Sequence, residues 1–159
     1  MEPSRLLPAL VGVLALASST VPIAAAAHHG TINATYAGHA SGSISGPTAS
    51  GSAVTAGHDS LVGKSTFSGS ATGNTSSPPC IHFTGTGAIK SAAGTIELAS
   101  LAGASACIGD ASGENGSFTG KARITGGSGK FAHAHGRLSF SGTYHNHAVQ
   151  ITLTGNITY

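Results

Sequence analysis

The sequence is poor in charged residues, and this scarcity excludes several classes of function. Only 8% of its 159 residues are Asp, Glu, Lys or Arg, and the formal net charge is +2. Scattered basic residues at this density argue against a nucleic-acid partner. Tryptophan is absent, and there are only five acidic residues, so catalysis by paired carboxylates has few candidates. Helical periodicity of apolar residues is also absent beyond the first 27 residues.

Long apolar runs are confined to the beginning of the chain. Residues 1–27 combine Arg5 with an apolar stretch and a closing alanine run, which is the layout of a secretory signal peptide. The alternative is an uncleaved anchor, because residues 6–27 would just span a bilayer. Pro22 and the alanines favour cleavage. We therefore expect residues 28–159 to form one exported domain, with no membrane contact after cleavage.

Apolar residues beyond the leader alternate with small polar ones, which predicts β-strands. In residues 38–60, rich in Gly, Ser, Ala and Thr, we expect only short edge strands around Ile44 and Val54, with a weakly specified register. About eight strands separated by glycine turns indicate a sandwich or a closed barrel. We favour an all-β, antiparallel, eight-stranded β-barrel, because closure removes edges that a chain with few charges leaves unprotected. The clearer strands are expected at residues 32–36, 61–71, 81–90, 95–101, 118–125, 137–144 and 148–159.

Cysteine is rare, with Cys80 and Cys107 as the two residues of this type. In an oxidising compartment a disulfide between them is the default. A crosslink closing such a loop stabilises the fold by about 3 kcal/mol in the chain-entropy model. A free reactive thiol is the alternative, but neither cysteine has an activating cluster near it in the sequence. We predict one Cys80–Cys107 disulfide.

A glycine-rich corner before a late strand is the most informative motif. We expect its glycines to permit a tight turn while the ring of Phe131 plugs one end of the core. The motif resembles the signature of the dirigent and allene oxide cyclase barrels, a Gly-Gly-Thr-Gly-basic-Phe corner followed by an Ala-x-Gly step. Ser128 stands where those families usually have threonine. The motif runs Ile124-Thr125-Gly126-Gly127-Ser128-Gly129-Lys130-Phe131 and continues with Ala132, Ala134 and Gly136.

The resemblance covers about residues 61–145. It extends to secreted bacterial proteins that share a cysteine opening a Gly-Thr-Gly strand, as in residues 80–87, and a second cysteine closing the next hairpin. It implies an eight-stranded antiparallel barrel of the allene oxide cyclase/dirigent-like type, with an interior that can hold an apolar ligand. It carries over no catalytic residue, because the polar pocket groups of the plant enzymes have no match in this chain.

Glu97 is the acid that the pattern places in the middle of a strand. If its face points into the barrel, burial makes it a candidate general acid or base. In the alternative, which we favour, Ile96 and Leu98 face the core and Glu97 faces water.

Histidine is frequent, with nine residues. In an extended strand His133 and His135 share one side, as do His145 and His147, and such pairs chelate Zn(II) or Cu(II). The alternative is that these side chains are solvent-facing polar residues near strand ends. If the two pairs lie on neighbouring strands, they would converge on one metal ion.

The expected mature terminus offers a second metal candidate. Cleavage of the leader would leave His28 and His29 at or next to the new α-amine, a nitrogen-rich set suited to Cu(II). This candidate is independent of the histidine pairs on the strands.

The sequence thus predicts a secreted, non-catalytic β-barrel that binds a small apolar ligand or serves as an extracellular structural module. The first alternative is a dirigent-like or cyclase-like enzyme that steers a reactive substrate in the barrel cavity. The second is a histidine-based divalent metal binder. An inward carboxylate would favour the enzyme, a filled interior the structural module, and converging histidines the metal binder.

Overall fold

A computed structural model describes residues 26–75, 79–110 and 114–159. Throughout these ranges the regular secondary structure consists of strands. No helix of these ranges is long and apolar enough to cross a membrane. The predicted signal peptide falls almost entirely on residues 1–25, outside the described residues.

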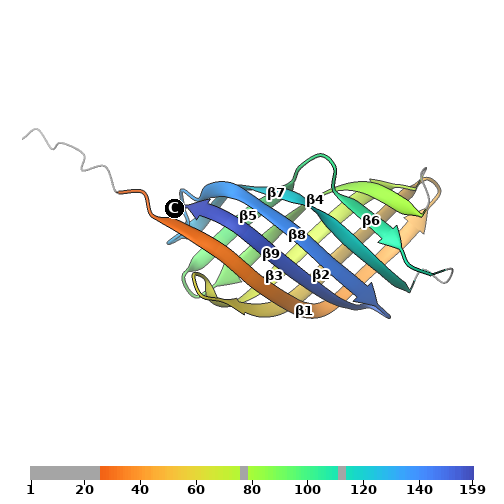
Figure 1. Cartoon of the computed structure of the whole chain (residues 1–159), viewed down its shortest axis with the longest axis horizontal. Helices are drawn as coiled ribbons and strands as arrows, with labels where there is room; N and C mark the ends of the chain where they lie inside the picture. The colour runs from red at the N-terminus through yellow and green to blue at the C-terminus, as the bar shows by residue number, and fades with distance from the viewer. Residues whose placement is uncertain (1–25, 76–78, 111–113) are drawn as a thin grey trace, which may run out of the picture.

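Nine strands form one antiparallel sheet that closes on itself (Figure 1). Closure occurs because β3, at one edge of the strand order, pairs with β4 as well as with β2. In addition, β7 pairs with β6 as well as with β5. β5 and β6 each lie between β4 and β7 and together fill one strand position, so the result is the predicted eight-stranded barrel. The strands are β1 (His29–Ser45), β2 (Thr48–Asp59), β3 (Gly63–Asn74), β4 (Cys80–Ser91), β5 (Gly94–Ser100), β6 (Ser105–Ile108), β7 (Asn115–Gly129), β8 (His135–His145) and β9 (Ala148–Thr158).

The hairpin of β1 and β2 differs from the sequence prediction. β1 extends over 17 residues and β2 over 12, so the short edge strands expected in residues 38–60 are wrong. The register is fixed by hydroxyl pairs across the strands, since Ser41 lies 3.1 Å from Ser52 and Ser43 lies 3.1 Å from Ser50. Gly46, with a φ of +58°, makes the tight turn between the strands. Pairing with β3 along the whole length of β2 holds the hairpin in the barrel wall.

The hydrophobic core occupies the interior of the barrel, because alternate residues of every strand point inward. Each large side chain that is fully buried stabilises the fold by about 1.5–3 kcal/mol. The largest of these are Tyr36, Phe131, Ile32, Ile89, Ile96, Leu138, Leu153 and Ile157.

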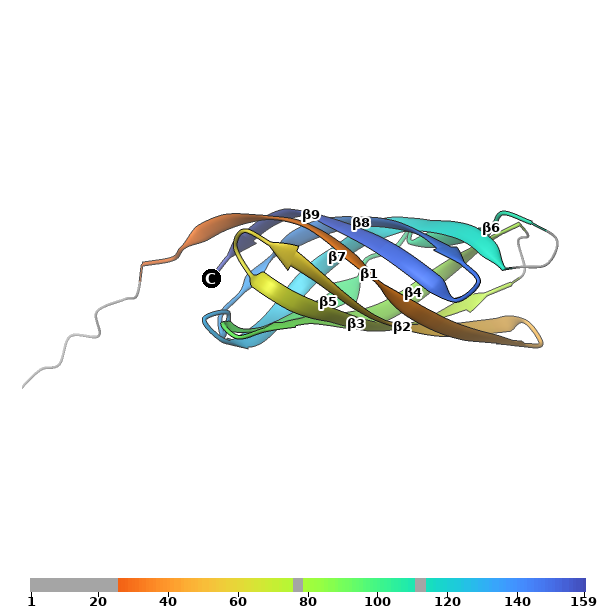
Figure 2. The same ribbon diagram turned by 90° about the horizontal axis from the view of Figure 1, so that it is seen from below.

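The two ends of the barrel differ. At one end the chain termini of the domain meet, since His28 and Tyr159 exchange backbone hydrogen bonds of 2.8 and 2.9 Å. We call this the plugged end, because the ring of Phe131 lies there, fully buried. At the opposite end, which we call the open end, the β1–β2 hairpin extends beyond β9 (Figure 2). β9 pairs with β1 only as far as His39, so residues 41–45 have β2 alone as a neighbour.

Candidate functional site

Aromatic side chains line the interior of the barrel toward the open end. Phe118 and Phe140 follow the same alternation as the buried Ala122 and Leu138 of their strands, so they point inward. In contrast with the fully buried core, these rings are only partly buried. Five rings share these properties: Phe67, Phe83, Phe118, Phe140 and Tyr144.

Glycines on neighbouring strands make space for these rings. Gly120 is the register partner of Phe140, and a Cβ placed on this glycine would lie 2.4 Å from the ring. Gly142 is the partner of Phe118, and a Cβ there would lie 2.3 Å from that ring. A side chain at either position would displace the ring into the interior. The alternation of glycine and aromatic residues therefore holds the rings against the wall of the barrel.

Two ring contacts connect strands that are not neighbours. Phe83 of β4 and Phe140 of β8 have ring centroids 6.0 Å apart, and Tyr36 of β1 and Phe67 of β3 are also separated by 6.0 Å. These distances suit attractive aromatic pairs. The rings therefore join opposite parts of the barrel wall between the core and the open end.

The fully buried Tyr36 brings a polar group into the core. Its hydroxyl lies 3.0 Å from the Ser65 hydroxyl, which in turn donates to the Gly63 carbonyl over 3.3 Å. Burial is the main cause that raises the pKa of Tyr36, and the charge of Asp59 raises it further. Tyr36 therefore stays neutral at physiological pH and donates to Ser65.

Asp59, the last residue of β2, is a buried acid. Its carboxylate accepts hydrogen bonds from the backbone N–H groups of Asn33 and Leu61, both at 2.7 Å, and of Val62 at 3.2 Å. The alternation of polar and apolar residues gave no sign of this burial, because an Asp followed by Ser is an ordinary turn signal. With three backbone donors on one carboxylate, Asp59 holds the turn between β2 and β3 in place.

Glu97 does not line the barrel. It is exposed, whereas its neighbours Ile96 and Leu98 are 0% and 6% exposed. The inward orientation that a catalytic role for Glu97 requires is therefore contradicted. The reason is the strict two-residue period of β5, which turns Ile96 and Leu98 toward the core and Glu97 toward solvent.

The two histidine pairs of the sequence prediction lie at opposite ends of the barrel. His133 belongs to the turn before β8, His135 is the first residue of β8, and His145 is its last. His145 lies ten positions after His135 along β8, which corresponds to about 33 Å. The condition for a shared metal ion, that the two pairs lie close together on neighbouring strands, is therefore not met. Across the described residues, no group of three or more His, Cys, Asp and Glu side chains is placed to hold a metal ion.

Both ring nitrogens of His145 have protein partners. His145 Nδ1 is hydrogen-bonded to the Asn115 side chain, and its Nε2 lies 3.0 Å from Asn146 Nδ2. His147 has a φ of +69° and forms the β8–β9 turn with Asn146, so it does not share a strand face with His145.

The histidines of the expected mature terminus lie at the plugged end. His28 stacks on Tyr159 with ring centroids 5.8 Å apart. His29 Nδ1 lies 3.0 Å from Thr158 Oγ1. Binding of Cu(II) by this pair remains a prediction.

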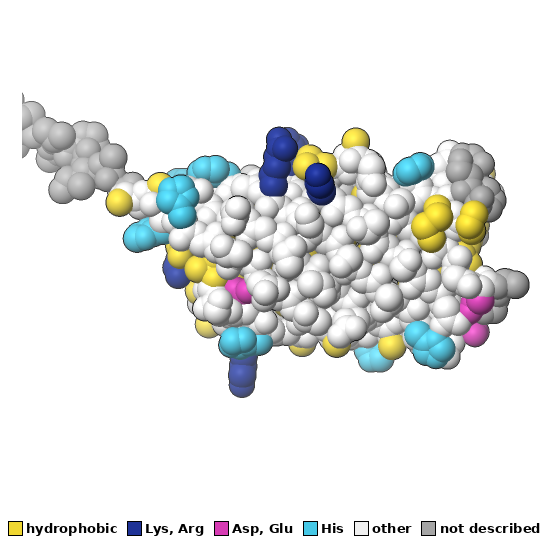
Figure 3. All heavy atoms as spheres, in the orientation of Figure 1, with side chains coloured by type: hydrophobic (Ala, Val, Ile, Leu, Met, Phe, Trp, Pro, Cys, Tyr) yellow, Lys and Arg dark blue, Asp and Glu magenta, His cyan; other side chains and the backbone are white. Residues whose placement is uncertain are grey.

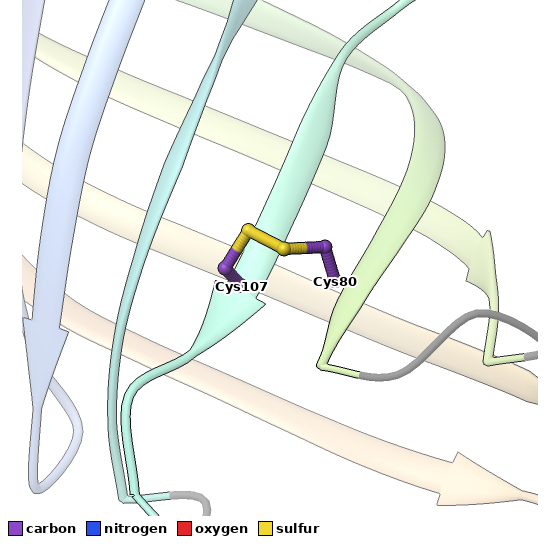
Figure 4. The surroundings of a disulfide bond; sticks show 2 residues. All are labelled: Cys80 and Cys107. Atoms are coloured by element: carbon purple, nitrogen blue, oxygen red, sulfur yellow. A yellow bond between two sulfur atoms is a disulfide. The ribbon is translucent and has the colours of Figure 1, made fainter.

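The predicted disulfide is confirmed (Figure 4). Cys80 is the first residue of β4, and its register partner Cys107 lies in β6 with a Cα–Cα distance of 4.0 Å. The bond holds the short strand β6 in the barrel wall near the open end.

The glycine corner has the geometry of a backbone-limited turn. Gly129 has a φ of +60°, and a Cβ on Gly127 would lie 2.1 Å from the Thr95 carbonyl oxygen. Only glycine fits both constraints without moving the chain. Gly126 and Gly136, each with a φ of +149°, frame the same segment, and Gly126 follows a β-bulge opposite Glu97.

Comparisons with known proteins place few limits on the activity. No family model and no curated protein matches the chain. Among solved structures, the barrel is similar to pyocyanin demethylase, with 18% sequence identity and a TM-score of 0.49. The match covers 80% of this chain and 99% of that protein. Similarity at this level does not transfer an activity.

Proposed function

We propose that this protein is a secreted, non-catalytic barrel that binds a small apolar ligand in its aromatic half. The observation that carries the proposal is the contrast between the two halves of the interior. Side chains of the plugged half, such as Phe131 and Ile32, are fully buried. The inward rings of the other half, such as Phe118 and Phe140, are only partly buried. These rings offer apolar area that the protein's own core does not cover.

The chemistry of the lining suits an apolar ligand. Phenylalanine rings give large contact areas with little conformational freedom to lose. Near the open end Tyr144 adds a hydroxyl, and burial together with the charge of Asp110 raises the pKa of Tyr144, so the hydroxyl stays protonated as a donor. A ligand would enter from the open end, because Phe131 closes the other.

The resemblance to the dirigent and allene oxide cyclase barrels supports this proposal, because those barrels have interiors that hold apolar molecules. Binding is favoured over catalysis because Glu97, the candidate catalytic acid, points to solvent. The buried Asp59 is held by three backbone N–H groups. The disulfide is consistent with an extracellular location.

The absence of tryptophan allows a direct test of ligand entry. Phe118→Trp places a single tryptophan on the inward face of β7, and Thr119→Trp places one on the outward face of the same strand. The probe is N-phenyl-1-naphthylamine, an uncharged apolar dye that accepts energy from tryptophan. We expect saturable binding to the unmodified protein and strong energy transfer from position 118.

The comparison of the two tryptophans decides between interior and surface binding. Equal transfer from positions 118 and 119 would place the dye on the surface and contradict the proposal. Failure of the unmodified protein to bind the dye would favour the structural module, with an interior filled by its own side chains. Because that measurement needs no substitution, the test holds even if Phe118→Trp does not fold.

A further inference from the structure

Half of the Lys and Arg residues in the described part of the chain lie on one area of the outer surface. Lys121 and Arg123 are exposed on β7, and Arg137 is exposed on the adjacent β8. Figure 3 shows Lys and Arg side chains gathered along the upper edge of the molecule, where β7 and β8 lie in Figure 1. The other described basic residues are Lys64, Lys90 and Lys130.

Within the part of the chain that the structure describes, no ion pair neutralises this basic area. Arg123 and Arg137 are direct register partners, so two like charges stand opposite each other across neighbouring strands. Such a pair destabilises a sheet. Glu97 lies on β5, two residues from the register partner of Arg123, but forms no ion pair with this arginine. A pair of like charges that costs stability, and to which the described acids offer no ion pair, indicates an external partner of opposite charge.

A hollow of about 490 Å³ adjoins Arg137. Two rows of side chains line it: one crosses from β8 over β9 to β1, and the other runs from β9 to β1. The first row consists of Arg137, Asn156 and Thr31, which are consecutive register partners. The second row passes through Thr158, which has His29 as its partner on β1. Hydroxyl, amide and imidazole groups therefore continue the basic area into a polar depression.

We propose that this surface, formed by Lys121, Arg123, Arg137 and the adjoining hollow, binds an acidic polysaccharide. The surface crosses four neighbouring strands, which is about 14 Å at a strand spacing of about 4.8 Å. It is therefore wider than a single acid group needs. Guanidinium groups bind carboxylates and sulfates in a bidentate manner.

The polar groups of the hollow suit the hydroxyl groups of a sugar chain. Thr31, Asn156 and Thr158 supply both donors and acceptors, which hydroxyl-rich ligands require. Single-stranded nucleic acids are bound through stacking of bases on aromatic rings. The residues of this surface include no Phe, Tyr or Trp, so a polysaccharide is favoured over a nucleic acid. The proposal does not depend on ligand binding inside the barrel.

The test measures binding of the full exported domain to polygalacturonate, dextran sulfate and uncharged dextran at low ionic strength. Arg123→Gln/Arg137→Gln is compared with Lys64→Gln/Lys90→Gln, which removes the same charge from β3 and β4. We expect binding to the acidic polymers and not to dextran. Loss of the two arginines should weaken binding about 100-fold. This corresponds to about 2.8 kcal/mol, since a tenfold change in affinity is about 1.4 kcal/mol. The lysine pair should change it less than about threefold, by reduced long-range attraction. The two acidic polymers show whether carboxylate or sulfate is preferred.

Three results would overturn the proposal. Equal weakening by the two double variants would show attraction by net charge alone. Binding of neither acidic polymer would show that the surface has another role. Tighter binding of a single-stranded oligonucleotide than of either polysaccharide would identify a nucleic-acid site instead. The melting temperature of each variant confirms that the fold is intact, because all four substituted side chains are exposed.

Discussion

The ring of Phe131 meets the ring of Tyr159 edge-on, with centroids 5.3 Å and planes 64° apart. The Lys130 ammonium lies over both, 4.9 Å from the Tyr159 ring and 5.8 Å from the Phe131 ring. Edge-to-face pairs contribute about 0.5–1.5 kcal/mol beyond the burial of their area. This contact joins the glycine corner to the last residue of the chain and thereby closes the plugged end of the barrel.

Replacement of the ring at the plugged end should be costly. We expect Phe131→Ala to lower the free energy of unfolding by about 3–5 kcal/mol, as truncations of buried aromatic residues do. Urea unfolding followed by circular dichroism measures the loss, and the exposed Ser128→Ala serves as control. A loss below about 1 kcal/mol would show that the ring contributes little to the core.

The close approach at the glycine corner gives a second prediction. A Cβ on Gly127 would lie 2.1 Å from the Thr95 carbonyl and 2.7 Å from the Phe131 carbonyl, so Gly127→Ala should force the backbone apart. We expect a loss of more than about 1 kcal/mol. Gly51→Ala is the matched control, since a Cβ there has its nearest neighbour at 3.4 Å. Similar urea midpoints for the two variants would contradict the role of Gly127.

The sequence was sufficient for the architecture because strand alternation is clear in its second half. The spacing of Ile96 and Leu98 correctly predicted the inward face of β5. Because the chain has one pair of cysteines, the sequence also predicted the crosslink. The β1–β2 hairpin was underestimated, because serine and glycine carry almost no hydrophobic signal. Its long register depends on the Ser41–Ser52 and Ser43–Ser50 pairs and on closure against β3, which local pattern does not show.

The candidate sites were harder to predict, because they depend on which strands become neighbours. Spacing along the chain grouped His135 with His133, whereas the fold brings His135 and His29 to opposite sides of Thr158. In the same way Arg123 and Arg137 are far apart in sequence and adjacent in the sheet. Both groupings follow from the way the strands pair in the barrel. The periodicity of the sequence does not show which strands pair or in which register.

The disulfide should contribute measurably to stability. Cys80 and Cys107 are separated by 27 residues, and in the chain-entropy model the loss of such a crosslink costs about 3 kcal/mol. We expect Cys80→Ala/Cys107→Ala to lower the urea midpoint accordingly. Alkylation of the unreduced protein followed by intact-mass measurement tests whether the bond is present in the unmodified protein. Incorporation of two alkyl groups would show free thiols and contradict the bond.

If Zn(II) shifts the melting temperature through these histidines, the contributions of the two ends of the barrel should be additive. Because His135 and His145 are about 33 Å apart, they cannot ligate one ion. We expect His133→Ala/His135→Ala and His145→Ala/His147→Ala to change the Zn(II)-dependent shift in melting temperature independently. The quadruple variant should show the sum of the two changes. A quadruple effect much smaller than that sum would indicate a shared ion and contradict the separation.

Tyr36 predicts a loss of stability at alkaline pH. In the fold its pKa is raised by burial, with a further contribution from the charge of Asp59, whereas in the unfolded chain it is about 10. The neutral form is therefore favoured by folding. This contribution is complete below about pH 10 and is lost as the pH rises toward the folded-state value, with a slope of up to about 1.4 kcal/mol per pH unit.

Tyr36→Phe isolates this effect. At pH 8 the variant loses the hydrogen bond to Ser65, which is worth about 0.5–1.5 kcal/mol, and Ser65 retains its bond to the Gly63 carbonyl. Above pH 10 its urea midpoint should fall less steeply than that of the unmodified protein, because no buried phenol remains to ionise. Tyr144→Phe measures the separate contribution of Tyr144, whose pKa is also raised by burial and by the charge of Asp110. Parallel declines of Tyr36→Phe and the unmodified protein between pH 9 and pH 11 would assign the alkaline transition to other groups.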